Sequence, residues 1–130
     1  MKWLTSFAKM EQQQKLQKLE QVFAGREPLD DSQLWSGYFQ QYGVAPDTVA
    51  KVRRILTEIL QADLSRIRDA DDFSKELAFF WSFDSLADVE IVQALEKGFD
   101  IIISDAEAEA MKTLRDIVLG VHAKITTPSA

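Results

Sequence analysis

Residues 81–99 read WSFDSLADVEIVQALEKGF, with a serine directly after an aspartate at the head of an apolar-rich run. The apolar positions recur at helical spacing, so we expect a helix over residues 85–98. Its predicted buried residues are Ile91, Val92 and Leu95. A different, outward-leaning stripe holds Leu86, Val89, Glu90, Gln93 and Lys97. This stretch raises the question of whether Ser85 is a chemical attachment point or only the residue that begins the helix.

Three segments of the chain pair a hydroxyl with an acid three residues later. They are Ser85–Asp88, Ser104–Glu107 and Thr113–Asp116. In such a capping box, each side chain satisfies a backbone N–H that the helix leaves without a partner. The boxes predict helices over residues 85–98, 104–111 and 113–124. As an N-cap, Ser85 would contribute about 1 kcal/mol and need no other role, so the motif alone is compatible with a structural and a functional serine.

The segments upstream are also helical in pattern. We expect helices over residues 2–24, from Asp30 to about Gly43, and over residues 47–61, followed by a long loop over residues 63–84. Leu64, Ile67, Phe73 and Leu77 are expected to anchor that loop. Its aromatic residues near 79–83 are expected to pack against a core. No stretch alternates apolar and polar residues long enough for a strand, so the sequence predicts an all-α bundle.

Composition excludes several classes of function. The 130 residues, 46% of them hydrophobic, suffice for one domain with a core. The chain has no cysteine and one histidine, which argues against a metal site or a thiol nucleophile. A net charge of −6 argues against nucleic-acid binding. No apolar run is long enough to span a membrane, and Lys9 and Glu11 interrupt a signal-like segment, so we expect a cytoplasmic protein.

Downstream of Asp84, the order of residues resembles the acyl carrier protein family. The matching elements are Asp84-Ser85-Leu86, Val89-Glu90, Ala94-Leu95-Glu96, Phe99-Asp100 and Ile103. The resemblance extends over about residues 47–125, and it implies an acyl-carrier-like helical bundle. It also implies that Ser85, flanked by Asp84, carries a covalent 4′-phosphopantetheine arm. The arm would bring the thiol that this cysteine-free chain lacks, so the carrier needs no catalytic residue of its own.

The resemblance also implies partners. Helix 85–98 would present Leu86, Val89, Glu90 and Gln93 to a phosphopantetheinyl transferase and to acyl-transfer or synthase enzymes of lipid or secondary-metabolite biosynthesis. Between Asp84 and Lys112, acidic residues outnumber basic ones by eight to two. The acids are at 84, 88, 90, 96, 100, 105, 107 and 109, and the bases are at 97 and 112. Such a surface suits basic patches on partner enzymes.

Residues 1–46 have no counterpart in a minimal carrier. They resemble the extensions of uncharacterised bacterial carrier-like proteins. An apolar stripe along the first helix includes Trp3, Leu4, Phe7, Leu16, Leu19, Val22 and Phe23. We expect this extension to pack on the bundle, near helix 47–61 and residues 79–81, or to form a homodimer. Residues 126–130 are expected to be a disordered tail.

Two other interpretations stay open. The chain could keep the carrier fold without being modified and serve as a protein–protein interaction module. More distantly, Asp84, Asp88 and Glu90 could be acid/base groups of an enzyme, although side chains exposed on a helix have nothing to raise a carboxyl pKa.

Overall fold

The computed structural model describes residues 2–127, with side chains from residue 6 onward. Its elements in chain order are α1 (Lys2–Phe23), α2 (Asp31–Tyr38), the 3-10 helix η1 (Gln40–Tyr42), α3 (Pro46–Leu60), α4 (Phe80–Phe83), α5 (Ala87–Phe99), α6 (Asp105–Glu109) and α7 (Leu114–Thr126). Strand-like pairing within the described range is limited to one isolated bridge, between Asp72 and Thr113. The predicted all-α bundle is therefore confirmed.

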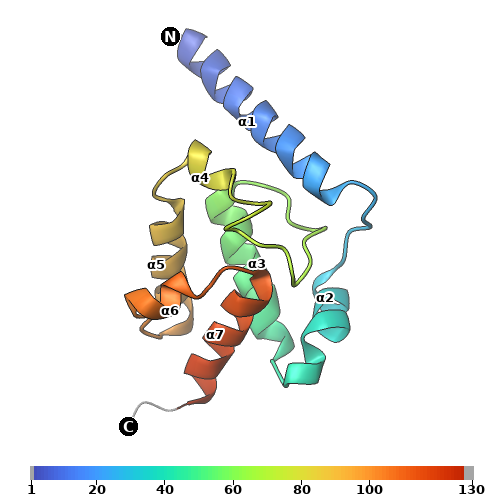
Figure 1. Cartoon of the computed structure of the whole chain (residues 1–130), viewed down its shortest axis with the longest axis vertical. Helices are drawn as coiled ribbons and strands as arrows, with labels where there is room; N and C mark the ends of the chain where they lie inside the picture. The colour runs from blue at the N-terminus through green and yellow to red at the C-terminus, as the bar shows by residue number, and fades with distance from the viewer. Residues whose placement is uncertain (1, 128–130) are drawn as a thin grey trace.

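Helix α3 is the central element, and it contacts α2, α5 and α7 (Figure 1). Pro46 stands in its first turn, where the missing N–H of proline costs nothing. The buried apolar residues of α3 recur at helical spacing along one side: Val49, Val52, Ile55, Leu56 and Leu60. This apolar face positions the helices that contact α3.

Helix α5 crosses α3 closely at Gly98. A Cβ atom at this position would lie 3.2 Å from Ile55 Cδ1 and 3.3 Å from Lys51 Cε. Lys51 also donates a hydrogen bond to the Gly98 carbonyl, and its ammonium lies 4.9 Å from the centroid of the Phe99 ring. These contacts fix the C-terminal end of α5 against α3.

The long connection after α3 is pinned to the core as predicted, because Leu64, Ile67, Phe73 and Leu77 are all buried. Its last residues are not loop, however, since Phe80–Phe83 form the short helix α4. The expected aromatic packing is present. The rings of Phe79 and Phe80 stack with centroids 4.5 Å apart, and the Trp81 indole N–H donates to the Phe73 carbonyl over 2.9 Å.

Among the described side chains of α1, only those in its C-terminal part are buried. Leu19 and Phe23 are buried in the same core as α3, and the Phe23 ring lies under the guanidinium groups of Arg26 and Arg66. Arg26 also pairs with the buried Asp71 carboxylate, 2.6 Å away.

The other half of α1 projects beyond the body of the molecule (Figure 1). Phe7 and Met10 there are 57% and 51% exposed, and Leu16 is exposed as well. Phe7 and Leu16 therefore do not pack on the bundle of their own chain, and the homodimer, the other expectation for this stripe, stays a prediction. The side chains of Trp3 and Leu4 lie outside the described residues.

Two of the predicted capping boxes are confirmed. Ser104 and Glu107 cap α6 reciprocally, and Thr113 and Asp116 do the same for α7. Helix α7 runs to Thr126, so a tail cannot begin at residue 126, where we expected it; residues 128–130 lie outside the described part. Within residues 2–127, no helix has the length and apolarity needed to cross a bilayer.

Candidate functional site

The Asp84-Ser85-Leu86 motif forms the turn between α4 and α5. The Asp84 N–H donates to the Phe80 carbonyl over 3.2 Å, which closes α4. Towards α5, the Asp84 carboxylate accepts the Leu86 N–H at 3.1 Å, and the Asp84 backbone carbonyl accepts the Ala87 N–H at 3.2 Å. One aspartate thus ends one helix and organises the entry to the next.

The capping box predicted for Ser85 and Asp88 is wrong. Helix α5 begins at Ala87, its N-cap position is Leu86, and no side chain bonds there as a cap. The Asp88 carboxylate instead accepts the N–H of its neighbour Val89 at 2.8 Å. The N-cap position of α5 is therefore one residue later than a capping box at Ser85 would place it, and the N–H of this N-cap residue is bonded to the Asp84 carboxylate.

Ser85 is exposed, and no hydrogen bond involves its hydroxyl among the described residues. The N-cap role, which would have explained Ser85 without any chemical function, is therefore not observed. What remains is an accessible hydroxyl at the head of a 13-residue helix. A negative group attached there gains from the free N–H groups and dipole of the helix N-terminus.

The predicted partner-binding residues are all on the surface. Leu86 is 63% exposed and Val89 49%, an unusual display of large apolar side chains, and Glu90 and Gln93 are exposed too. They do not share one environment, because Val89 and Gln93 border one cleft and Glu90 borders another. On the buried side, Ile91 and Leu95 lie in the core, whereas Val92 is only partly buried.

The first of these clefts, about 500 Å³ in volume, lies along α5, α6 and α7. Its wall is largely apolar and includes Leu56, Phe73, Trp81, Ile91 and Ile117. The aromatic residues upstream of Ser85 therefore contribute directly to this cleft.

The second cleft, of about 540 Å³, lies between α1, the end of α3, α4 and the start of α5. Phe83, Asp84, Ala87 and Glu90 line it, so it opens beside Ser85. Its wall on α1 includes Gln12 and Lys15, which belong to none of the sequence motifs. Lys15 stands one helical turn before the buried Leu19, and that i, i+4 spacing was the available signal.

The three carboxylates considered for acid/base chemistry lie on the surface of α5 and of the turn before it. Asp84, Asp88 and Glu90 are all exposed, and residues 2–127 contain no group of three or more His, Cys, Asp or Glu side chains placed to hold a metal ion.

Comparison with known proteins gives a consistent match. The family described as "Phosphopantetheine attachment site" matches residues 50–120, more than half of the chain. An acyl carrier protein of Helicobacter hepaticus is 38% identical over 77 residues, which cover 59% of this chain and 96% of that protein. An acyl carrier protein of Phenylobacterium zucineum is 39% identical over 72 residues, covering 55% of this chain and 86% of that protein. The matched segment contains the turn at Ser85 and leaves out α1 and α2.

Proposed function

The chain belongs to the acyl carrier protein family, whose members hold acyl groups on a covalently attached 4′-phosphopantetheine, and we propose that Ser85 is where this arm is attached. The Ser85 oxygen would attack the phosphorus of a phosphopantetheine donor and form the phosphodiester. At the same time, the P–O bond between that phosphorus and the donor's leaving phosphate would break. The hydroxyl proton would pass to a base of the transferase. The family match favours this carrier role over an unmodified interaction module.

The free hydroxyl of Ser85 is the observation that supports the attachment site best. A serine that capped α5 would need to break a hydrogen bond to be modified, whereas Ser85 is exposed and makes none among residues 6–127. The head of α5 also suits the anionic product, because a phosphodiester at a helix N-terminus is favoured by the dipole. Asp84 has the supporting role, since its side chain shapes the turn.

Intact mass spectrometry after co-expression with a broad-specificity phosphopantetheinyl transferase tests this attachment. We expect the mass to increase by one phosphopantetheine. Ser85→Ala should abolish the increase, and Ser82→Ala should not, although Ser82 is an exposed serine only three residues away. An unmodified chain after treatment with several transferases, including one from the source organism, would overturn the assignment.

We further propose that α5 is the docking face for the transferase and for acyl-transfer or synthase enzymes with basic patches. Leu86 and Val89 supply the exposed apolar surface, and Glu90 adds charge beside it, with Gln93 one turn further along. Exposed charges at the rim of an interface mainly steer association, and salt weakens them.

Charge reversal on α5 tests the docking face. Glu90→Lys should slow modification severalfold at low salt, whereas Glu27→Lys makes the same charge change outside α5 and should leave the rate unchanged. Leu86→Ala should weaken partner binding with little loss of stability, because Leu86 is largely exposed. Rates that respond to neither α5 variant would place docking elsewhere.

Acyl carriers are not catalysts, and we propose no enzymatic activity for this chain. We also propose a cytoplasmic location, which fractionation of cells expressing the tagged full chain tests. The division into an extension of residues 1–46 and a carrier domain of residues 47–125 is likewise our proposal. It is supported by the family match, which begins at residue 50.

A further inference from the structure

Helix α1 forms one wall of the cleft beside Ser85, although it lies outside the segment that matches the family. Two hydrogen bonds hold it there. The Lys15 ammonium donates to the Leu60 carbonyl over 2.9 Å, and the Gln12 side-chain amide donates to the Gln61 carbonyl over 3.2 Å. Both carbonyls lie at the C-terminal end of α3. The extension is therefore fixed across the end of α3 and determines how wide the cleft is.

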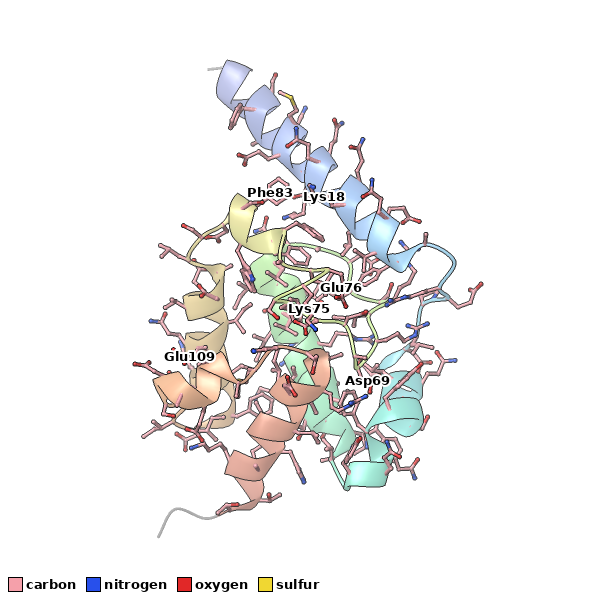
Figure 2. The ribbon with its side chains drawn as sticks, in the orientation of Figure 1. Lys18, Asp69, Lys75, Glu76, Phe83 and Glu109 are labelled. Atoms are coloured by element: carbon pink, nitrogen blue, oxygen red, sulfur yellow. The ribbon has the colours of Figure 1, made fainter. Side chains whose placement is uncertain are left out.

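The lining of this cleft combines apolar side chains with acidic ones. Phe80 and Ala87 are buried, and in Figure 2 Phe83 points from α4 towards α1, where Lys18 is labelled on the facing helix. Four carboxylates also line the cleft, each from a different part of the fold: Glu11 of α1, Glu58 of α3, Asp84 of the turn and Glu90 of α5.

The charges of the lining are not balanced within the chain. Lys15 is the single basic side chain among the described residues that line the cleft, so three of the four negative charges have no counterpart there. None of the five ion pairs within residues 6–127 involves these carboxylates. Partial burial lowers the pKa of Lys15, and the carboxylates of Asp84 and Glu11 oppose that shift, so both lie near its ammonium. The cleft therefore attracts a positively charged group and repels an anion.

An arginine or lysine side chain fits such a cleft. Its aliphatic stem packs on apolar surface while its charged head remains with the carboxylates. The ring of Phe83 offers a further cation–π contact. For a guanidinium group, carboxylates also provide paired hydrogen bonds of favourable geometry.

The position of the cleft indicates which partner would supply this side chain. Phe83, Asp84 and Ala87, which flank Ser85 in the sequence, all line the cleft. An enzyme that acts on the Ser85 hydroxyl must cover this turn, and so it also covers the mouth of the cleft. Glu11 lies outside the segment that matches the family, whereas Glu58 lies within it. An enzyme that contacts Glu11 would thus distinguish this chain from carriers made of the matched segment alone.

We propose that the cleft between α1 and the start of α5 is a docking site for an arginine or lysine side chain of the phosphopantetheinyl transferase that modifies this chain. This inference rests on the proposed attachment at Ser85, and it extends the docking face on α5 to Glu11 and Glu58. The extension is then a recognition element, because it supplies one wall of the site.

Steady-state kinetics with the purified transferase of the source organism test this docking site. Glu11→Lys and Glu58→Lys should each raise the KM for the full-length carrier by roughly three- to fivefold at low salt, the range of a partly exposed ion pair. The kcat should not change, because neither residue lies next to the Ser85 hydroxyl in the sequence and the loss concerns binding. The rise in KM should shrink at high salt, since salt screens exposed charges.

Glu27→Lys is the matched control, because it makes the same charge change at an exposed position outside the cleft. Its KM should equal that of the wild type. Wild-type KM values for Glu11→Lys and Glu58→Lys would overturn the docking site, and so would an equal rise for Glu27→Lys. Intact mass of the wild-type product separates these results from a failure of the attachment. If the wild type stays unmodified, the attachment at Ser85 fails and this inference fails with it.

A change of shape without a change of charge gives a second test. Ala8→Trp fills the cleft from α1 and should raise the KM as well. Gln13→Trp places the same ring at an exposed position of α1 that does not line the cleft, and it should leave the KM unchanged. Circular dichroism of each variant checks that α1 remains folded. An unchanged KM for a folded Ala8→Trp protein would show that no partner side chain enters the cleft.

Discussion

At the scale of single residues, the three hydroxyls that were predicted to cap helices differ: those of Ser104 and Thr113 do so, and that of Ser85 does not. The Thr113 hydroxyl accepts the Asp116 N–H at 3.0 Å and caps α7, whereas the Ser85 hydroxyl caps nothing among the described residues. We therefore expect Thr113→Ala to lower the free energy of unfolding by about 1 kcal/mol. Ser85→Ala should change it by less than about 0.5 kcal/mol. Urea unfolding of the unmodified proteins measures both, and a comparable loss for Ser85→Ala would mean that the serine has a structural role.

Glu107 gives a residue-scale prediction about pH. Lys124, whose ammonium lies 2.7 Å from the carboxylate, and the Ser104 N–H lower the pKa of Glu107 from 4.5 to about 2. Because the folded-state pKa is depressed, this stabilisation is complete above pH 4.5 and is lost as the pH falls towards about 2. Solvent around the exposed carboxylate keeps the effect small.

Unfolding at a series of pH values tests the role of Glu107. Glu107→Gln should destabilise the protein above pH 4.5, and its difference from wild type should shrink as the pH falls towards about 2. Glu109→Gln, the same change at an exposed position on α6, should show no such convergence. A pH-independent difference for Glu107→Gln would mean that its ionisation is not coupled to folding.

The same residues show what local sequence can predict. Ser104 and Thr113 begin helices as predicted, because each box is the nearest source of cap hydrogen bonds for its helix. The box at Ser85 is absent, and there Asp84, one residue earlier, organises the turn by accepting the Leu86 N–H. Spacing alone does not rank two adjacent acceptors. Without the box, the Ser85 hydroxyl has no hydrogen-bond partner among the described residues.

At the scale of elements, α1 is anchored by its C-terminal end. Phe23 is fully buried with the guanidinium groups of Arg26 and Arg66 over its ring, whereas Phe7 is mostly exposed on the projecting half. We expect Phe23→Ala to cost about 3 kcal/mol or more, the usual range for removing a buried phenylalanine. Phe7→Ala makes the same chemical change and should cost less than about 0.5 kcal/mol. Equal losses in urea unfolding would show that the projecting half is buried in solution.

The periodicity of apolar residues predicted where most helices lie along the chain, but it did not predict what each helix packs against. The apolar face of α3 predicted both the helix and its burial, because that helix lies in the centre of the core. The pattern of α1 predicted a helix correctly but could not show where the helix leaves the bundle. That point depends on the shape of the surface formed by α3, α4 and the long connection. For the same reason, the sequence indicated a loop at 79–83 where packing produced α4, and it did not reveal the cleft at Lys15.

At the scale of the whole molecule, the extension and the carrier segment share one hydrophobic core. Leu19, Phe23, Leu34 and Phe39 from residues 1–46 belong to the same buried cluster as Leu56 of α3. Arg53 of α3 also donates to the Leu29 carbonyl over 2.8 Å and pairs with Asp31. The two parts of the chain therefore stabilise each other, and removal of the entire extension would expose core residues.

The projecting half of α1 has a different consequence for the whole molecule, and it leads to our last prediction. Phe7 and Met10 are three residues apart, so they lie on one face of the helix with more than half of each side chain exposed. Two copies of such a face bury each other most simply in a two-fold pair. We expect the full chain to form a weak homodimer, with a mass that rises from 14.8 kDa towards twice that value as concentration increases.

Size-exclusion chromatography with light scattering measures this mass. The double variant Phe7→Ser and Met10→Ser should remain monomeric at every concentration, because it removes the apolar face and leaves the anchor at Leu19 and Phe23 in place. Leu86→Ala is the control, since it removes an equally exposed apolar side chain from α5 and should still allow the dimer. A full chain that stays monomeric throughout would contradict self-association, and the exposed face of α1 would then have to be explained by contact with a different protein.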